Sequence, residues 1–195
     1  MKQVLIINGH PDKESFNYAL SSSYKDGANK TNSSISEINI SDLNFNPSLE
    51  YGFRKRTELE PDLIKALEKI KNADHIVWFF PLWWASYPAI MKGFIDRIFL
   101  PGITFELEEG SHEPIGLLKG KSSSVFITSD TPEDYDKQIM HQPVLHQFKT
   151  GTLEYCGVSP VYVTYISTVS DSTLEFREHW IKKIYTIGEK QALIE

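Results

Sequence analysis

The segment from Gly9 to Tyr18 brings together polar side chains that can hold an anion. It offers an imidazole at His10, a hydroxyl at Ser15 and an amide at Asn17, next to the start of a helix expected over residues 16–28. Free N–H groups and the helix dipole attract phosphate at such an N-terminus. We therefore expect a cofactor phosphate here. In a competing interpretation, Ser15 and Asn17 only cap the helix, and His10 is a turn residue satisfied by the backbone.

A second segment, residues 80–88, is too rich in aromatic side chains for an ordinary solvated connection: it reads Phe-Pro-Leu-Trp-Trp-Ala-Ser-Tyr-Pro. Trp and Tyr planes stack on planar rings, and the N–H groups of such a loop can hydrogen-bond ring heteroatoms. Together with a phosphate site, the loop predicts a flavin whose isoalloxazine ring it covers. Alternatively, Trp83 and Trp84 pack in a dimer interface, and the two interpretations are compatible.

Two residues in the segment 127–143 are candidates for proton chemistry. Tyr135 and His141 carry a phenol and an imidazole, which can donate a proton to oxygen or accept one from it while a hydride crosses. Taken alone, either residue can be an incidental polar side chain. We find no His or Cys spacing typical of a metal site, and no Gly-x-Ser-x-Gly or other nucleophile signature.

The elements that must position these residues alternate short apolar runs with segments of helical spacing. Strands are expected at residues 4–7, 36–40, 75–80, 123–128 and 158–165. Helices are expected over 16–28, from 61, from 88, over 143–155 and from 174 to about 193, with irregular stretches at 51–60 and 106–120. This order predicts one α/β domain over residues 1–195: a doubly wound five-stranded parallel sheet with helices on both faces. Its ligand should sit beyond the carboxyl ends of the strands.

Composition fits one well-cored domain and excludes several classes of function. Of 195 residues, 41% are hydrophobic, and the formal net charge of −6 argues against nucleic acid as the main partner. The single cysteine, Cys156, cannot form an internal disulfide. The first apolar run is too short for a signal peptide, and Pro81 and Pro88 interrupt the most apolar stretch. We expect a cytoplasmic protein without membrane insertion. The first loop also lacks Gly-x-Gly-x-x-Gly, which disfavours a Rossmann-type dehydrogenase.

Several segments in the right order resemble the NAD(P)H:quinone oxidoreductase (DT-diaphorase-like) family and its bacterial relatives in the flavodoxin-2 group. The resemblance covers nearly the whole chain and rests on His10 with residues 15–19, 41–47, Phe80-Pro81-Leu82 with Trp84, 88–94, Thr128-Ser129, Tyr135 with His141, and 151–157.

The resemblance implies a flavodoxin-like fold and a flavin cofactor. The phosphate side of the flavin would be bound by His10, Ser15, Phe16 and Asn17. Its ring would be held by Pro81, Leu82, Trp83, Trp84 and Ala85, and by Thr128, Ser129 and Asp130. By the same resemblance Tyr135 and His141 assist hydride transfer, Trp84 lines the substrate pocket, and Phe105 and Tyr155 complete it across a homodimer interface. The region before and at Pro61-Asp62 is similar to that of FAD-binding members, which favours FAD over FMN.

Two departures from the family pattern bear on substrate choice. Asp130-Thr131 stand where mammalian members have Gly-Gly, and the loop to Tyr135 is one residue shorter. Ala85 occupies a position that is aromatic in those members. We expect a different backbone approach to the flavin and a roomier pocket.

The function predicted from the sequence is hydride transfer from NAD(P)H through a bound flavin to a quinone-like acceptor, with ping-pong kinetics. Two alternatives come from other classes. One is a flavodoxin-like electron carrier, against which the Trp83-Trp84 loop argues because a carrier needs no substrate shelf. The other is a flavin- and nucleotide-binding ancillary subunit that regulates a membrane transport system.

Overall fold

The computed structural model describes residues 1–108, 110 and 113–191, and its centre is a five-stranded parallel sheet. The strands lie in the order β2 (Ser33–Asn39), β1 (Lys2–Asn8), β3 (His75–Pro81), β6 (Ser122–Ser129) and β7 (Val161–Ser167). The chain moves outward from β1 to β2 and then returns past β1 to β3, so the topological switch point lies between β1 and β3. The loops after those two strands border the crevice in which such sheets bind ligands.

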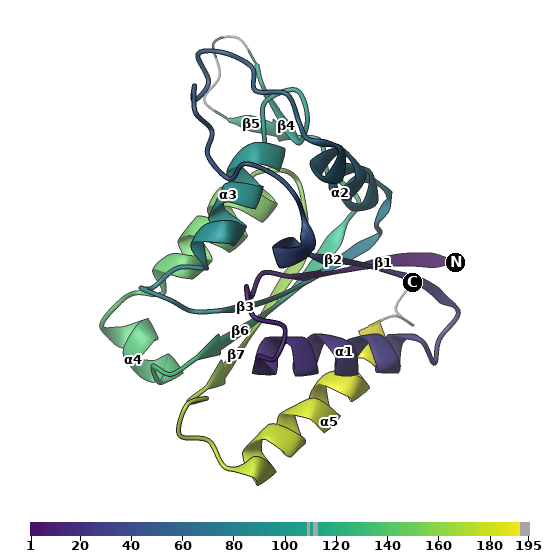
Figure 1. Cartoon of the computed structure of the whole chain (residues 1–195), viewed down its shortest axis with the longest axis vertical. Coiled ribbons are helices and arrows are strands. Elements are labelled where there is room, and N and C mark those ends of the chain that lie inside the picture. The colour runs from purple at the N-terminus through teal and green to yellow at the C-terminus, as the bar shows by residue number, and fades with distance from the viewer. Residues whose placement is uncertain (109, 111–112, 192–195) are drawn as a thin grey trace.

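Helices cover both faces of the sheet (Figure 1). One face carries α1 (Phe16–Ala28) and α5 (Leu174–Gln191), and the other carries α2 (Pro61–Asn72), α3 (Ala89–Ile98) and the π-helix η2 (Leu145–Glu154). Along β1, Leu5 and Ile7 pack in the core with α2 and α3, whereas Val4 and Ile6 pack in the core with α1 and α5. A strand buried on both faces must be apolar at every position. The predicted doubly wound α/β fold is confirmed.

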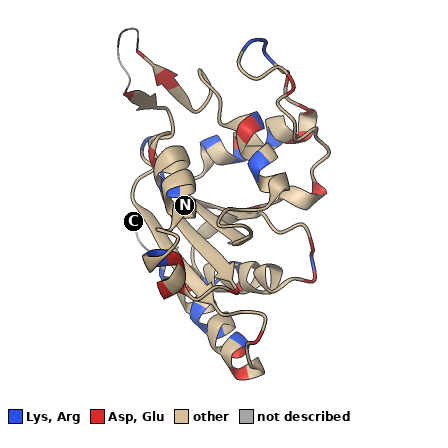
Figure 2. Ribbon diagram, turned by 90° about the vertical axis from the view of Figure 1, so that its left-hand side faces the viewer, with Lys and Arg blue, Asp and Glu red and all other residues tan. Residues whose placement is uncertain are grey.

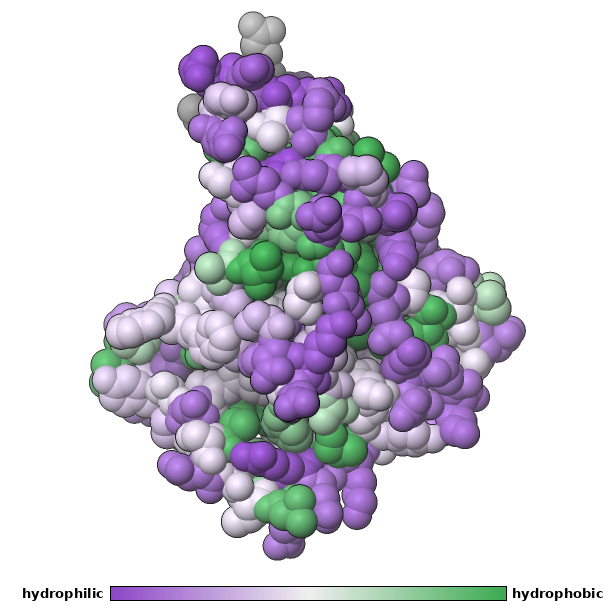
Figure 3. Space-filling view, in the orientation of Figure 1, coloured by the Kyte–Doolittle hydropathy of each residue, from purple (hydrophilic) through white to green (hydrophobic). Residues whose placement is uncertain are grey.

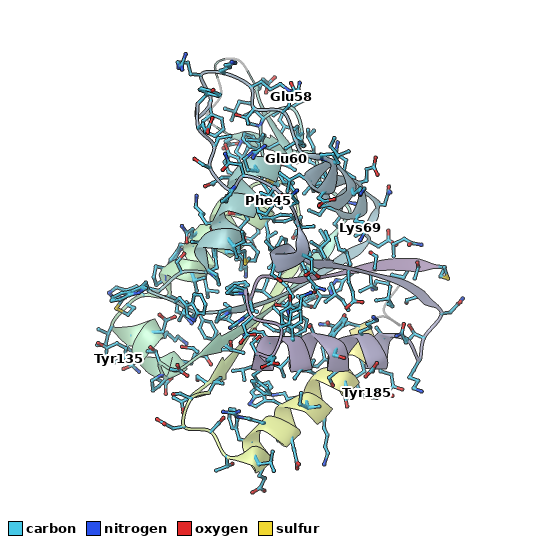
Figure 4. The ribbon with its side chains drawn as sticks, in the orientation of Figure 1. Phe45, Glu58, Glu60, Lys69, Tyr135 and Tyr185 are labelled. Atoms are coloured by element: carbon cyan, nitrogen blue, oxygen red, sulfur yellow. The ribbon has the colours of Figure 1, made fainter. Side chains whose placement is uncertain are left out.

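Helices α1 and α5 approach closely because two glycines face the opposite backbone. A Cβ atom on Gly27 would lie 2.1 Å from the carbonyl oxygen of Tyr185, and one on Gly188 would lie 2.3 Å from that of Tyr24. Figure 4 labels Tyr185 on α5, below α1. This packing fixes α1, whose N-terminus borders the switch point.

The structure differs from the sequence prediction at several element boundaries. Strand β2 begins three residues earlier than 36, and Ile40–Asp42 form a 3-10 helix, η1, instead of ending the strand. Strand β7 begins at Val161 and not at Val158, since Pro160 has no N–H to donate to a strand ladder. The π-helix replaces most of the helix expected over 143–155. Helix α5 is described to Gln191, and residues 192–193 of its expected end lie outside the described residues.

One hairpin and one short helix were not predicted at all. The stretch 106–120, expected to be irregular, contributes to an antiparallel hairpin of β4 (Phe105–Leu107) and β5 (Pro114–Gly116), which projects away from the sheet (Figure 1). A six-residue helix, α4 (Glu133–Gln138), follows β6.

Charged residues of both signs are interspersed over the surface, and a basic run stands out at the loop tip 54–56 (Figure 2). Within the described residues, no helix combines the length and the apolar character needed to cross a membrane.

Candidate active site

The loops after β1, β3, β6 and β7 enclose a polar pocket of about 160 Å³ at the carboxyl edge of the sheet. Its walls are His10, Ser15, Phe16, Asn17, Pro81, Leu82, Trp83, Thr128, Ser129, Asp130 and Val169. All except Val169 are residues that the sequence assigns to cofactor binding. The fold thus brings three separate predicted segments into one site.

Ser15 and Asn17 each leave a polar oxygen without a partner at the pocket. Ser15 precedes α1 as its N-cap residue, but its hydroxyl makes no capping hydrogen bond. Ser15 Oγ and Asn17 Oδ1 are both buried and have no hydrogen-bond partner. Buried polar atoms without partners are rare, and here they lie beside the free N–H groups of a helix N-terminus. Capping therefore does not account for Ser15. These polar groups fit the phosphate side of a flavin: the Ser15 hydroxyl and the N–H groups can donate to phosphate, and the Asn17 amide oxygen can accept from a cofactor hydroxyl.

His10 is partly engaged by its own turn. Its Nδ1 lies 2.9 Å from the Asp12 nitrogen and 3.1 Å from the Asp12 oxygen, so this ring nitrogen is satisfied by the backbone. Nε2 is the ring nitrogen left for a ligand. Burial lowers the pKa of His10, although the backbone and the charge of Asp12 act in the opposite direction. The neutral imidazole, held edge-on against Trp83 with ring centroids 5.5 Å apart, is therefore favoured.

The aromatic loop forms a tight turn with Trp84 and Ala85 at its tip. Trp83 N donates to Ser86 O at 2.8 Å, and Ser86 N donates to Trp83 O at 3.0 Å. Trp84 and Ala85 have φ values of 52° and 58°, a type I′ arrangement that usually takes Asn-Gly. The Trp84 side chain is fully exposed, and neither tip residue lines the pocket. A strained turn that presents an indole to solvent suggests contact with a ligand or a second molecule.

Hydrogen bonds between loops join the walls of the pocket. Leu82 N donates to Thr128 O at 2.7 Å, and Val169 N donates to Ser129 O at 3.1 Å. Asp130, which replaces a glycine of the mammalian pattern, accepts a hydrogen bond from Ser170 N at 2.7 Å. The loop after β7 is thus a fourth wall of the site.

Arg177 on α5 lies behind two pocket walls, Phe16 and Val169. Its guanidinium lies 5.9 Å from the centre of the Phe16 ring and donates to Val169 O at 3.2 Å and to Ser172 Oγ at 2.9 Å. A fixed cation beside the pocket complements a phosphate. No motif marks Arg177, because only the packing of α5 on α1 brings it to the first loop.

Tyr135 and His141 lie at the same edge of the sheet but do not line the pocket. Tyr135 lies on α4 at the corner of the molecule (Figure 4), and both side chains are exposed. His141 and Gln142 have φ values of 59° and 48°. The structure therefore places both residues outside the pocket walls, on an exposed segment after β6 that contains a second strained turn.

Phe105 and Tyr155 lie in a different and larger groove of about 890 Å³. Their rings meet edge to face with centroids 5.0 Å apart. Most of the other walls are apolar, among them Leu49, Phe53, Ile95, Phe99 and Leu107. Figure 3 shows hydrophobic side chains reaching the surface just below the projecting hairpin. An apolar groove of this size is typical of a surface that a second molecule covers.

Comparison with known proteins agrees with this geometry. The family model Flavodoxin_2, described as a flavodoxin-like fold, matches residues 2–184. An uncharacterized NAD(P)H oxidoreductase of Haemophilus influenzae is 30% identical over 162 residues, which cover 80% of this chain and 79% of that protein. NAD(P)H dehydrogenase (quinone) 1 of Rattus norvegicus is 26% identical, covering 99% of this chain and 80% of its own. The crystal structure of Smu.1420 from Streptococcus mutans aligns with a TM-score of 0.84 at 26% identity, covering 96% of this chain and 99% of that one.

The chain belongs to the Flavodoxin_2 family. In the part of the chain that the structure describes, no three His, Cys, Asp or Glu side chains are grouped to hold a metal ion.

Proposed function

We propose that the protein is a flavin-dependent oxidoreductase that takes a hydride from NAD(P)H and passes it to a quinone-like acceptor. The observation that carries the proposal is the pair of buried oxygens without partners, Ser15 Oγ and Asn17 Oδ1, at the N-terminus of α1. The names of the relatives in Haemophilus influenzae and Rattus norvegicus support the same class of reaction.

The residues of the pocket bind and orient the cofactor. Ser15 Oγ, the N–H groups of the first turn of α1 and the nearby Arg177 hold the phosphate. Backbone of the loops 81–85 and 128–130 holds the ring, and His10 and Phe16 flank it or its chain. A bound flavin supplies the two-electron chemistry. FAD is the form we favour, on the likeness of the region at Pro61-Asp62 to FAD-binding proteins.

Tyr135 and His141 act at the open side of the ring. The phenol donates a hydrogen bond and the imidazole supplies or takes a proton as negative charge develops, and each contributes on the order of a few kcal/mol when well aligned. Trp84 contacts the reactants. NAD(P)H and the acceptor occupy this place in turn, which gives ping-pong kinetics.

The working form is a homodimer. Trp84 is fully exposed in the single chain, and the groove that contains Phe105 and Tyr155 is apolar. A second copy covering that groove would bury Phe105 and Tyr155 and bring them to the partner's site. Because NAD(P)H is the donor, we place the protein in the cytoplasm.

Release of the cofactor from purified protein, with its mass measured, tests the proposal and distinguishes FAD from FMN. We expect about one flavin per chain. Protein that binds neither FMN nor FAD on reconstitution would refute the proposal. A subunit that only regulates a transporter would bind flavin but would not be reduced at a useful rate by NADH or NADPH.

A further inference from the structure

One buried carboxylate lies on the helix that follows β6 and is not a wall of the pocket. Asp136 on α4 is 1% exposed. Every other side chain from Pro132 to His141 is exposed, including the apolar Ile139 and Met140. The segment that carries Tyr135 and His141 is therefore attached to the core by a charged residue and by no apolar one.

The partner of Asp136 lies on the last strand. Tyr165 of β7 is 8% exposed, and its hydroxyl donates to Asp136 Oδ2 at 3.0 Å. Burial raises the pKa of Tyr165, and the negative charge of Asp136 raises it further, so the phenol keeps its proton and is the donor. A buried carboxylate is stable only when it is hydrogen-bonded, and this bond meets that need.

The same residue also controls the turn that follows α4. Asp136 O accepts a hydrogen bond from Gln142 N at 3.0 Å, and the Gln142 side chain interacts with the Tyr165 hydroxyl, which opposes the rise in the pKa of Tyr165. His141 and Gln142 both have left-handed backbone, a conformation that persists only where the surroundings impose it. Asp136 and Tyr165 thus fix both the helix that carries Tyr135 and the turn that carries His141.

We propose that Asp136, through its bond to Tyr165, is a positioning residue that holds Tyr135 and His141 over the mouth of the cofactor pocket. This inference rests on the proposed function, in which those two side chains act on the reactants. Asp136 itself touches neither reactant nor cofactor.

The test uses full-length protein reconstituted with flavin and four variants: Asp136→Ala, Asp136→Asn, Tyr165→Phe and the double variant Asp136→Ala with Tyr165→Phe. Asp134→Ala, which removes an exposed carboxylate from the same helix, is the matched control. Hydrogen exchange measured by mass spectrometry follows the amides of Ile139, Met140 and Gln142, which donate within the segment. Stopped flow follows flavin reduction by NADH, and a titration gives the flavin dissociation constant.

We expect Asp136→Ala and Tyr165→Phe to speed exchange in residues 133–142 at least tenfold. The limiting rate of flavin reduction should fall at least tenfold, while the flavin dissociation constant changes less than threefold. Asp136→Asn keeps an acceptor for the Tyr165 hydroxyl and should stay within threefold of the parent. The double variant should be no worse than either single one, because both changes remove the same bond. Asp134→Ala should behave as the parent.

Unchanged exchange in Asp136→Ala would overturn the anchoring role. Faster exchange with an unchanged reduction rate would overturn the positioning role. A global loss of stability and of flavin, with rescue by neither Asn nor the double variant, would mean that Asp136 is merely structural, which also overturns the inference. If the parent binds flavin but NAD(P)H does not reduce it, the proposed function fails, and the exchange data still decide whether Asp136 anchors the segment.

Discussion

Asn17 Nδ2 donates a hydrogen bond of 2.7 Å to Thr128 Oγ1, and this bond joins the first turn of α1 to the end of β6. Both residues line the pocket, and the bond leaves the Asn17 oxygen buried without a partner. The bond thus joins two segments that are more than a hundred residues apart in sequence, and Asn17 Oδ1 stays available as an acceptor. A pocket preformed in this way would lose little entropy on binding a ligand.

Ser15→Ala separates ligand binding from helix capping. If the Ser15 hydroxyl binds phosphate, the flavin dissociation constant should rise by about 10- to 100-fold, the scale of a hydrogen bond to a charged group. Because the hydroxyl makes no capping bond, the unfolding free energy of the flavin-free protein should stay within about 0.5 kcal/mol of the parent. A capping role would instead cost about 1 kcal/mol and leave flavin affinity alone. Chemical denaturation and flavin titration measure the two quantities.

His141→Ala should lower the rate of flavin reduction by NAD(P)H by roughly ten- to a thousandfold while flavin content stays near normal, because an acid–base or charge-stabilising group is lost. Tyr135→Phe should give a smaller loss of the same kind, since only the hydroxyl goes. Stopped-flow measurement of flavin bleaching gives the reduction rates of the parent and of both variants. A His141→Ala protein that keeps its flavin and is reduced as fast as the parent removes His141 from the mechanism.

Stability should fall on acidification because of His75, a buried residue at the start of β3. Its ring lies 2.8 Å from Ser122 Oγ and 3.2 Å from Ser124 Oγ, and burial lowers its pKa to about 4. The unfolded chain, with an ordinary histidine pKa near 6.5, therefore binds the proton first as the pH falls. The contribution of His75 is complete above about pH 6.5 and is lost progressively towards pH 4, by about 3 kcal/mol in total.

Urea denaturation at a series of pH values measures this loss. His75→Gln should flatten the dependence between pH 6.5 and 4, whereas His179→Gln, at an exposed position on α5, should not. Equal acid slopes in the parent and in His75→Gln would show that another group is responsible.

Much of the fold followed from the sequence, and the misses have physical causes. The apolar run Val4–Ile7 predicts a strand buried on both faces. Pro61 predicts a helix start, because its fixed backbone angle suits the first helical position. Ser33 and Ser34 have no strand preference and are recruited by pairing with β1. The hairpin strands are three residues each, too short for a periodic pattern.

The sequence predicted which residues lie together where they follow a strand directly, but not where tertiary packing decides. His10, Ser15, Asn17 and Thr128 meet in one pocket as the loop positions require. Helix α4 has no apolar stripe, since Asp136 is its buried residue, and so it gave no signal. The left-handed turn at Trp84 and Ala85 uses neither Asn nor Gly, the residues by which such turns are recognised.

A change at the apolar groove should abolish the dimer. Phe105→Asp places a charge among apolar walls, so sedimentation should show a homodimer for the parent and a monomer for the variant. Catalytic turnover of the monomeric variant should also fall, because Phe105 and Tyr155 would no longer complete the partner's site. Tyr162→Asp, an exposed change on β7 away from the groove, is the control. A parent that is monomeric under active conditions would contradict the dimer proposal.

The most direct measurement is an anaerobic titration of the reconstituted protein with NADH and NADPH, followed by addition of a quinone. The account predicts about one flavin bound per chain, bleaching of that flavin by at least one of the two nucleotides, and full return of its colour on stoichiometric quinone. Failure to bind FMN or FAD, or a bound flavin that neither nucleotide bleaches, would contradict it.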